Sequence, residues 1–177
     1  ETFEKEFPVK IVRIDSDEIK KLIPQYTGNN STAIQGASAL GAEKIYDWVL
    51  DHGQNVIVDG TFVNYEKSFS NIKRSLDKQR EVAIFYISQV PQVAWDFTQK
   101  REVVEGRNIP KEAFIRSFFG SRINVNKIKE VFRDKVQLNL VIKDSLNDDE
   151  DIKMNVDNVE KYLNKEYTED ELKKLIL

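Results

Sequence analysis

Two carboxylates, Asp15 and Asp17, follow directly after a short run that is mainly β-branched, Ile11 to Ile14. In an open α/β sheet, ligands bind at the carboxyl ends of the strands, so both acids are expected where chemistry takes place. A carboxylate there can accept a proton from a substrate hydroxyl, as the base in phosphoryl transfer does. The alternative is structural, because Asp17 is also a good N-cap for the helix that follows, with Asp15 as a turn residue.

A second acid ends the next predicted strand, in the sequence Asp59-Gly60-Thr61. Glycine allows a ligand to approach the backbone closely, and the flanking side chains offer a hydrogen-bond acceptor and a hydroxyl. On a neighbouring parallel strand this tripeptide would lie at the same edge of the sheet as Asp17. The pair therefore indicates a polar binding site.

Arginines and one further acid complete the candidates. Arg101 and Arg107 flank a predicted helix end and a loop with Gly106, where guanidinium groups can close over phosphates. The alternative for the arginines is a solvated helix terminus. Glu43 points either into the cleft or into water, with water slightly favoured. His52 is expected at a helix C-terminus and receives no role.

The elements that position these side chains follow from hydrophobic periodicity and from stop signals. Because strands and helical stretches alternate, the sequence predicts parallel β-α-β units. The continuous apolar run over 82–87 is typical of a strand buried on both faces. Strands are expected over 9–15, 55–59, 81–88 and 136–142, and helices over 18–23, 32–52, 64–80, 91–104 and 110–133, the last with a weak point at Gly120.

The two ends of the chain have patterns of their own. Glu1 to Phe7 has the spacing of the last turns of a helix, which Pro8 stops. After an acidic stretch at 147–151, capping boxes at Asp157/Glu160 and Thr168/Glu171 predict two short helices. We expect a single domain over 1–177, with a core at about 9–144 and a helical tail at 145–177.

Composition excludes several classes of protein. The 177 residues contain no cysteine and one histidine, so disulfides, thiolate metal sites and multi-histidine zinc sites are excluded. A net charge of −3 lacks the basic footprint of a nucleic-acid binder, so we do not expect nucleic acid as the main partner. No apolar run approaches the ~20 residues that span a bilayer. A cytoplasmic protein without a membrane partner is the default expectation.

Taken together, several segments resemble the zeta-toxin family of P-loop kinases, which phosphorylate UDP-N-acetylglucosamine. The resemblance covers roughly 9–142, and its motifs occur in the family's order. The residues that carry it are Ile14-Asp15-Ser16-Asp17-Glu18 with Pro24 and Tyr26, Gln35-Gly36-Ala37-Ser38-Ala39, Val56 to Thr61, Arg101, and Glu105 to Pro110.

The resemblance implies a P-loop-kinase-like α/β/α fold in three layers with a mainly parallel sheet. It implies transfer of the ATP γ-phosphate to a sugar hydroxyl of the nucleotide sugar, with Mg²⁺, by the toxin of a toxin–antitoxin system with an antitoxin protein as partner. The site residues that it implies are Asp17 as base, Arg101 and Arg107 on the phosphates of ATP, and Glu43, Asp59, Gly60 and Thr61 on the substrate. Asp15 would be structural or metal-facing, and Asp15 or Asp59 would be an outer ligand of magnesium.

One departure from the family concerns the phosphate-binding loop. No G-x-x-x-x-G-K-[ST] occurs in the 177 residues, although this loop cradles the phosphates and ligates magnesium. We expect the first strand and the loop to precede Glu1, and these residues alone to bind ATP poorly and to be inactive. The alternatives are a related kinase that acts on a polynucleotide end or a small antibiotic, and a non-catalytic module that binds a nucleotide sugar or an antitoxin.

Overall fold

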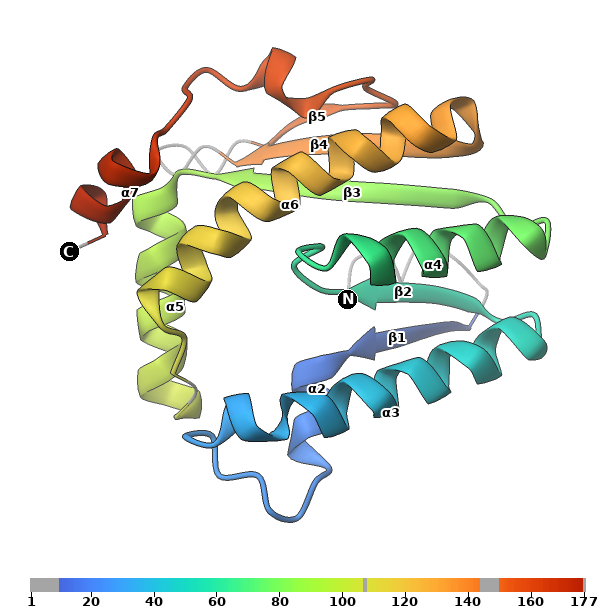
Figure 1. Cartoon of the computed structure of the whole chain (residues 1–177), viewed down its shortest axis with the longest axis horizontal. Helices are drawn as coiled ribbons and strands as arrows, with labels where there is room; N and C mark the ends of the chain where they lie inside the picture. Colours follow the sequence, from blue (N-terminus) through green and yellow to red (C-terminus); the bar gives the residue numbers. More distant parts are fainter. Residues whose placement is uncertain (1–9, 107, 144–149, 177) are drawn as a thin grey trace. The chain divides into compact units, whose positions relative to one another are not determined.

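Strands and helices alternate along the chain, which confirms the predicted α/β class (Figure 1). The computed structural model describes residues 10–106, 108–143 and 150–176, so the helix end expected over Glu1 to Phe7 lies outside the described residues. The elements are β1 (Ile11–Asp15), α2 (Ser16–Lys21), α3 (Ser31–Asp51), β2 (Asn55–Asp59), α4 (Tyr65–Asp77), β3 (Val82–Gln89), α5 (Pro91–Glu105), α6 (Lys111–Phe132), the 3₁₀ turn η1 (Arg133–Lys135), β4 (Val136–Lys143), β5 (Glu150–Lys153), η2 (Val159–Tyr162) and α7 (Glu169–Leu175).

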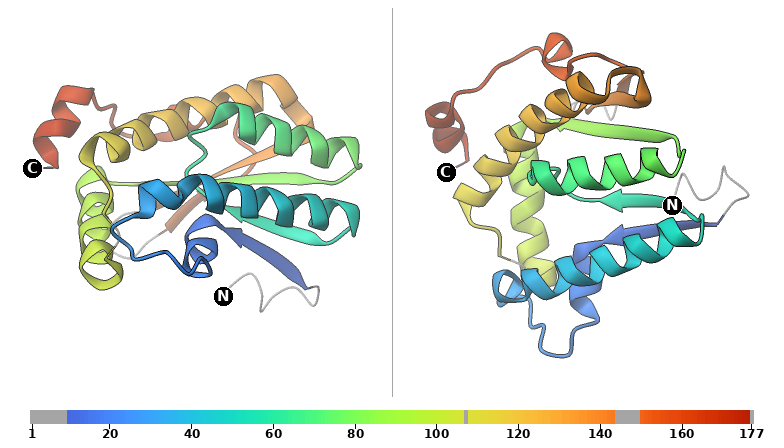
Figure 2. Two further views of the ribbon diagram at one scale, coloured as in Figure 1. Left: turned by 60° about the horizontal axis from the view of Figure 1, so that its bottom comes forward. Right: turned by 45° about the vertical axis from the view of Figure 1, so that its right-hand side comes forward.

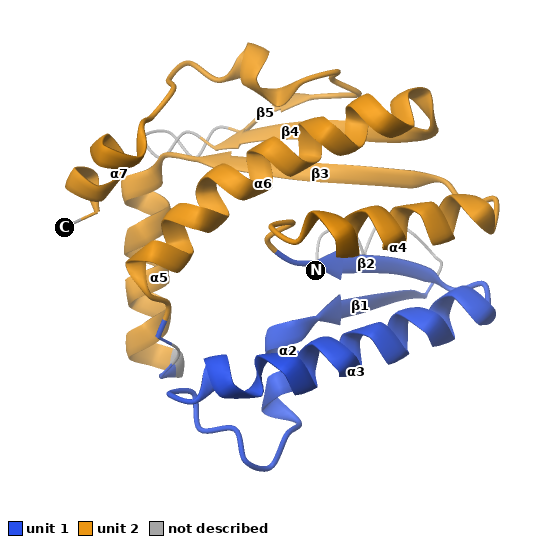
Figure 3. Cartoon of the chain, viewed as in Figure 1, with its two compact units in different colours: residues 1–60, 105–108 blue, residues 61–104, 109–177 orange. Residues whose placement is uncertain are grey.

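The chain forms two compact units, drawn in different colours in Figure 3. The first unit comprises residues 1–60 and 105–108, and the second comprises residues 61–104 and 109–177. The first contains the parallel pair β1-β2, and the second contains a sheet in the order β3-β4-β5. Each unit has an apolar cluster of its own.

In the first unit, β1 and β2 pair in parallel with Ile14 opposite Val58 and Asp15 opposite Asp59. The carboxyl ends of both strands therefore lie level with each other, as the sequence predicts. Helix α3 packs along one face of the pair in both views of Figure 2. Its Tyr46 and Leu50 are buried with Ile14, because apolar residues at helical spacing form one stripe on α3.

The short helix α2 packs closely against α3 where the sequence has small residues. A Cβ atom placed on Gly41 would lie 3.0 Å from Cγ2 of Ile19 on α2. A side chain at this position would require Ile19 to shift by a few tenths of an ångström. Gly41, from the cluster Gly36 to Ala42, thus lets α2 lie directly beside α3.

In the second unit, β3 and β4 are parallel, and β5 pairs antiparallel with β4. Helices α4 and α6 pack on this sheet, and η2 packs on α6. Their shared core consists of Ile72, Ile84, Val125, Ile128, Val136, Leu138, Leu140, Val156 and Val159. A smaller cluster of Trp95, Ile115, Leu172 and Ile176 joins α5, α6 and the C-terminal segment.

Two predictions about the tail are wrong, and the weak point predicted at Gly120 does not interrupt its helix. The acidic stretch ends in a strand, β5, because its backbone completes the edge of β4. Asp157 does not begin a helix, since Asn158 caps the 3₁₀ turn η2 by accepting from the Glu160 N–H. Helix α6 runs unbroken through Gly120, whose missing side chain lets Val63 approach to about van der Waals distance of a Cβ.

Strand β3 is not buried on both faces within the part of the chain that the structure describes. Ile84 is 8% exposed, whereas Phe85 is 45% and Ile87 is 58% exposed. Helices α4 and α6 cover the face of β3 that carries Ile84. Because side chains alternate along a strand, Phe85 and Ile87 lie on the opposite face. None of the described helices is long and apolar enough to cross a membrane.

Candidate active site

Asp15, and not Asp17, caps the helix at the end of β1. The backbone of Asp15 is extended (φ −125°, ψ 118°), and its Oδ1 accepts a hydrogen bond of 2.9 Å from the Asp17 N–H. Helix α2 therefore begins at Ser16, and the expectation that Asp17 caps a helix starting at Glu18 is wrong. The side chain of an N-cap residue accepts a hydrogen bond from the backbone N–H two or three residues ahead. Asp15 meets this condition through the Asp17 N–H. The Asp17 carboxylate does not cap α2.

Asp17 lies in the first turn of α2, and its carboxylate contacts a buried lysine. Nζ of Lys20 lies 3.3 Å from Oδ1 of Asp17 and donates a 2.9 Å hydrogen bond to Oγ of Ser31 on α3. The Asp17 side chain is 22% exposed and that of Lys20 only 4%. The Asp17 carboxylate, at the carboxyl end of β1, is thus partly exposed. The buried ammonium group of Lys20 contacts it from the protein interior.

Arg13 joins the acids of the two strands. Its Nη2 lies 2.7 Å from Oδ2 of Asp59 and 3.0 Å from Oδ2 of Asp15. All three side chains lie on one face of the β1-β2 pair, because Arg13 and Asp15 are two residues apart and Asp15 is level with Asp59. The hydrogen bond that Arg13 donates to Asp59, together with the negative charges of both acids, raises the pKa of Arg13 above its ordinary value.

This arrangement bears on the magnesium ligands expected from the sequence. Both carboxylate oxygens of Asp15 are engaged, Oδ1 by the helix cap and Oδ2 by Arg13. The structural alternative for Asp15 is therefore favoured over a metal-facing one. In the described ranges, no group of three or more acidic or histidine side chains is arranged to hold a metal ion.

The chain after Asp59 is held by an asparagine that the sequence analysis did not single out. Thr61 is exposed, and the next residue, Phe62, has a positive φ of 59°. Nδ2 of Asn124, buried on α6, donates to the carbonyl oxygens of Phe62 (3.0 Å) and Val63 (2.8 Å). These bonds fix the backbone beside the expected substrate-binding hydroxyl of Thr61.

The remaining candidates that the structure describes belong to α3 and α5. Glu43 lies on α3 and is partly exposed, so its orientation toward the cleft or toward water stays a prediction. Arg101 is exposed on α5 in the second unit, and Arg107 lies outside the described residues. His52 ends α3 as expected, with its ring stacked on Trp48 at 4.3 Å.

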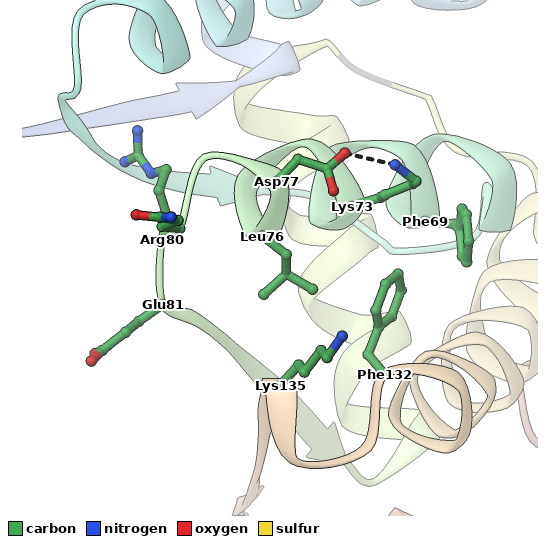
Figure 4. A pocket seen from close by; sticks show the side chains of 9 residues that line it. Phe69, Lys73, Leu76, Asp77, Arg80, Glu81, Phe132 and Lys135 are labelled. Carbon is green, nitrogen blue, oxygen red and sulfur yellow. Dashed lines mark hydrogen bonds and ion pairs between the residues drawn. The ribbon is translucent and has the colours of Figure 1, made fainter.

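A hollow in the second unit contains none of the predicted site residues (Figure 4). Its volume is about 550 Å³, and Glu81 and Lys135, which line it, directly precede β3 and β4. It therefore lies at the amino ends of these strands, whereas ligands of open α/β sheets bind at the carboxyl ends. Lys73 and Asp77 at its wall pair at 2.6 Å. We do not assign the active site to it.

Sequence reasoning missed Arg13, Lys20 and Asn124. A spacing signal existed for two of them, since Lys20 is three residues after Asp17 on a helix and Arg13 is two residues before Asp15 on a strand. No local signal marks Asn124, because its partners Phe62 and Val63 are about sixty residues earlier in the chain.

Comparison with known proteins agrees with the motifs at β1 and β2. A search of curated proteins gives no significant match. The sequence model of one protein family, described as Zeta toxin, matches residues 1–164, which includes β1, β2 and every candidate site residue. The chain therefore belongs to the Zeta toxin family.

Proposed function

We propose that this protein is a kinase that transfers the γ-phosphate of ATP to a sugar hydroxyl of UDP-N-acetylglucosamine. Members of the Zeta toxin family are kinases, so a phosphotransferase that uses a nucleotide is the class of activity that membership brings. The choice of acceptor and the roles of individual residues are our proposal. They rest on the motif resemblance and on the geometry at the end of β1.

The observation that carries the proposal is the position of Asp17. It stands in the first turn after β1, partly exposed, in a helix whose cap is made by Asp15. A carboxylate that neither caps its helix nor is fully buried suits the role of general base toward a bound hydroxyl.

In the proposed step, the sugar hydroxyl oxygen attacks the γ-phosphorus of ATP. Its proton passes to the Asp17 carboxylate, the new O–P bond forms, and the bond to the β–γ bridging oxygen breaks to release ADP. Asp17 then returns the proton to solvent. Positioning and charge stabilisation provide most of the rate in reactions of this kind.

The other residues have supporting roles in the proposal. Arg101 and Arg107 stabilise the charge on the phosphates of ATP, and Glu43, Gly60 and Thr61 hold the nucleotide sugar. Asp59 also binds the nucleotide sugar, because its carboxylate can accept a hydrogen bond from a substrate hydroxyl in place of one from Arg13. Magnesium arrives with ATP, because this ion is commonly held by phosphates together with one or two carboxylates.

We further propose that both compact units belong to one kinase domain, since the family match spans them. The proposed setting is the cytoplasm, where UDP-N-acetylglucosamine is phosphorylated by a toxin whose partner is a neutralising antitoxin protein. These points follow from family resemblance alone.

The test uses the full chain encoded by the gene, with radiolabelled ATP and a panel of acceptors. The panel contains UDP-N-acetylglucosamine, a DNA oligonucleotide with a free 5′-hydroxyl, and an aminoglycoside. We expect label only on the nucleotide sugar. Asp17→Asn should lower kcat by about 100-fold or more, in the range of general base catalysis, with KM nearly unchanged. Glu18→Gln, at the exposed neighbouring acid, is the matched control and should retain activity.

Each part of the proposal has an outcome that overturns it. Label on the oligonucleotide or the aminoglycoside, with none on the nucleotide sugar, would refute the acceptor. An Asp17→Asn variant that works as well as Glu18→Gln would refute the base. Absence of transfer to every acceptor would leave the binding-module alternative in place of the kinase.

A further inference from the structure

The most deeply buried cation of the first unit that the structure describes lies beside the proposed base. Lys20 is 3% exposed as a residue, although lysine is almost never buried without partners for its ammonium group. It lies between α2 and α3, the two helices that approach closely at Gly41 (Figure 1). Burial of this charge demands an explanation.

The contacts of Lys20 point toward Asp17. Its Nζ contacts Oδ1 of Asp17 at 3.3 Å, one turn earlier on the same helix, and is held from the other side by Oγ of Ser31 at 2.9 Å. Ser31 is itself only 8% exposed and is the first residue of α3. The ammonium group is therefore fixed by a second helix and is not free to follow a moving carboxylate.

The neighbouring pair on the same helix provides an internal comparison. Lys21 and Glu18 have the same three-residue spacing and a shorter contact of 2.8 Å, but their side chains are 50% and 61% exposed. An exposed pair of this kind has little effect on structure or orientation. Lys20 and Asp17 differ from it in burial and in the added bond to Ser31.

We propose that Lys20 is a positioning residue for Asp17, and the proposal rests on the function proposed above. By holding Oδ1 from the protein interior, Lys20 restricts the rotation of the carboxylate and directs it outward from the end of β1. Ser31 holds Lys20 in turn. Through the contacts of Lys20 with Ser31 and Asp17, the position of α3 therefore limits where the Asp17 carboxylate, which takes the proton, can lie. Because Lys20 is only 3% exposed, we expect that bound substrates do not reach it, so its loss should affect the chemical step and leave binding intact.

The first experiment compares kinetic constants of the full gene-encoded chain. Lys20→Met keeps most of the side-chain volume and should lower kcat by about tenfold or more, the scale of a misplaced catalytic group, with KM for ATP and for the nucleotide sugar within about twofold. Ser31→Ala leaves Lys20 in contact with Asp17 and should lower kcat by about twofold to fivefold. Lys21→Met is the matched control and should behave as wild type.

A second measurement does not depend on activity. In NMR spectra of side-chain ammonium groups, Lys20 should give a slowly exchanging signal at neutral pH, because it is buried and hydrogen-bonded. Asp17→Asn should shift this signal and Ser31→Ala should speed its exchange, whereas Glu18→Gln should leave it unchanged. A signal that Asp17→Asn does not move would overturn the proposed contact.

The outcomes separate this inference from the proposed function. If Asp17→Asn abolishes transfer and Lys20→Met behaves as Lys21→Met, the function stands and the positioning role is wrong. If the decrease in kcat of Lys20→Met and Ser31→Ala is accounted for by the fraction of protein that has unfolded, Lys20 only stabilises the packing of α2 on α3. The inference is then also wrong. If Asp17→Asn has no effect on kcat, the proposed base fails first.

Discussion

Lys129 allows a quantitative test of how the second unit is held together. It is 4% exposed near the end of α6, and its three ammonium hydrogens each have an acceptor. The acceptors are the carbonyl oxygens of Arg133 (3.2 Å) and Val136 (3.0 Å) and Oδ1 of Asn155 (2.9 Å). One side chain thus joins α6 to the start of β4 and to the segment after β5.

The perturbation is Lys129→Met, which keeps the length of the side chain and removes the donors. The carbonyl oxygen of Val136 is buried with Lys129, and loss of its bond costs about 1–3 kcal/mol. Arg133 and Asn155 are exposed, so water can replace part of their bonds, and each loss costs about 0.5–1 kcal/mol. The methionine has no charge to desolvate, which offsets some of this. We expect the free energy of unfolding to fall by about 2–4 kcal/mol.

The assay is urea unfolding followed by circular dichroism, on the 177-residue chain. For a chain of this size, the expected loss corresponds to a decrease in Tm of about 5–15 °C. Lys127→Met is the control, because Lys127 is exposed on the same helix and contacts the ring of Tyr65 at 6.0 Å. Such an exposed contact is worth about 0.5–1 kcal/mol at most. The slope of the unfolding curve should not change in either variant.

The result that refutes the reasoning is a Lys129→Met variant as stable as Lys127→Met, or more stable than wild type. In that case desolvation of the ammonium group would outweigh its three hydrogen bonds. The buried lysine would then be a net cost to the second unit.

Two further predictions concern the same unit. Arg133 has φ 49° and ψ −123°, a region that favours glycine, so Arg133→Gly should raise the free energy of unfolding by about 1 kcal/mol after the entropy of the unfolded chain is counted; equal or lower stability in urea would contradict this. Hydrogen bonds from the backbone and then the side chain of Thr168 lower the pKa of Glu171 below its ordinary value of 4.5. The stability that this carboxylate gives α7 is therefore present above that value and lost as the pH falls through the lower folded-state pKa. Amide exchange in α7, measured by NMR, should speed up over that acidic range in wild type and much less in Glu171→Gln, which has no titrating carboxylate; identical pH profiles would exclude the Glu171 carboxylate as the cause.

Local sequence predicts most elements because their signals are local. The strand over Asn55–Asp59 is found at its predicted residues, and α7 begins with the predicted capping box of Thr168 and Glu171. Hydrophobic periodicity marks α3, α4, α5 and α6 to within a few residues at each end. Cap and turn residues set helix ends through bonds that span two to four positions, so no distant contact is needed to predict them.

The candidate site was predictable in part for the same reason. Two acids after one β-branched run and a third after the next predict a polar edge wherever the strands are parallel neighbours, and the register of Asp15 with Asp59 confirms it. The sequence did not predict which of Asp15 and Asp17 caps α2. Either acid suits a cap by type, and only the backbone at the end of β1 decides that Asp15 makes the bond.

By itself, then, the sequence determined the α/β class, the order of the elements and the acids at the ends of β1 and β2. Only the tertiary structure decided that Lys20 is buried between α2 and α3, that Arg13 joins Asp15 to Asp59, and that Asn124 holds the backbone beside Thr61. The physical reason is common to all three. Burial and hydrogen bonding of a polar side chain depend on which elements pack against it, and these partners come from parts of the chain that no local pattern connects. The acids at the end of β1 can be recognised in the sequence, whereas the contacts that orient them can be recognised only in the folded structure.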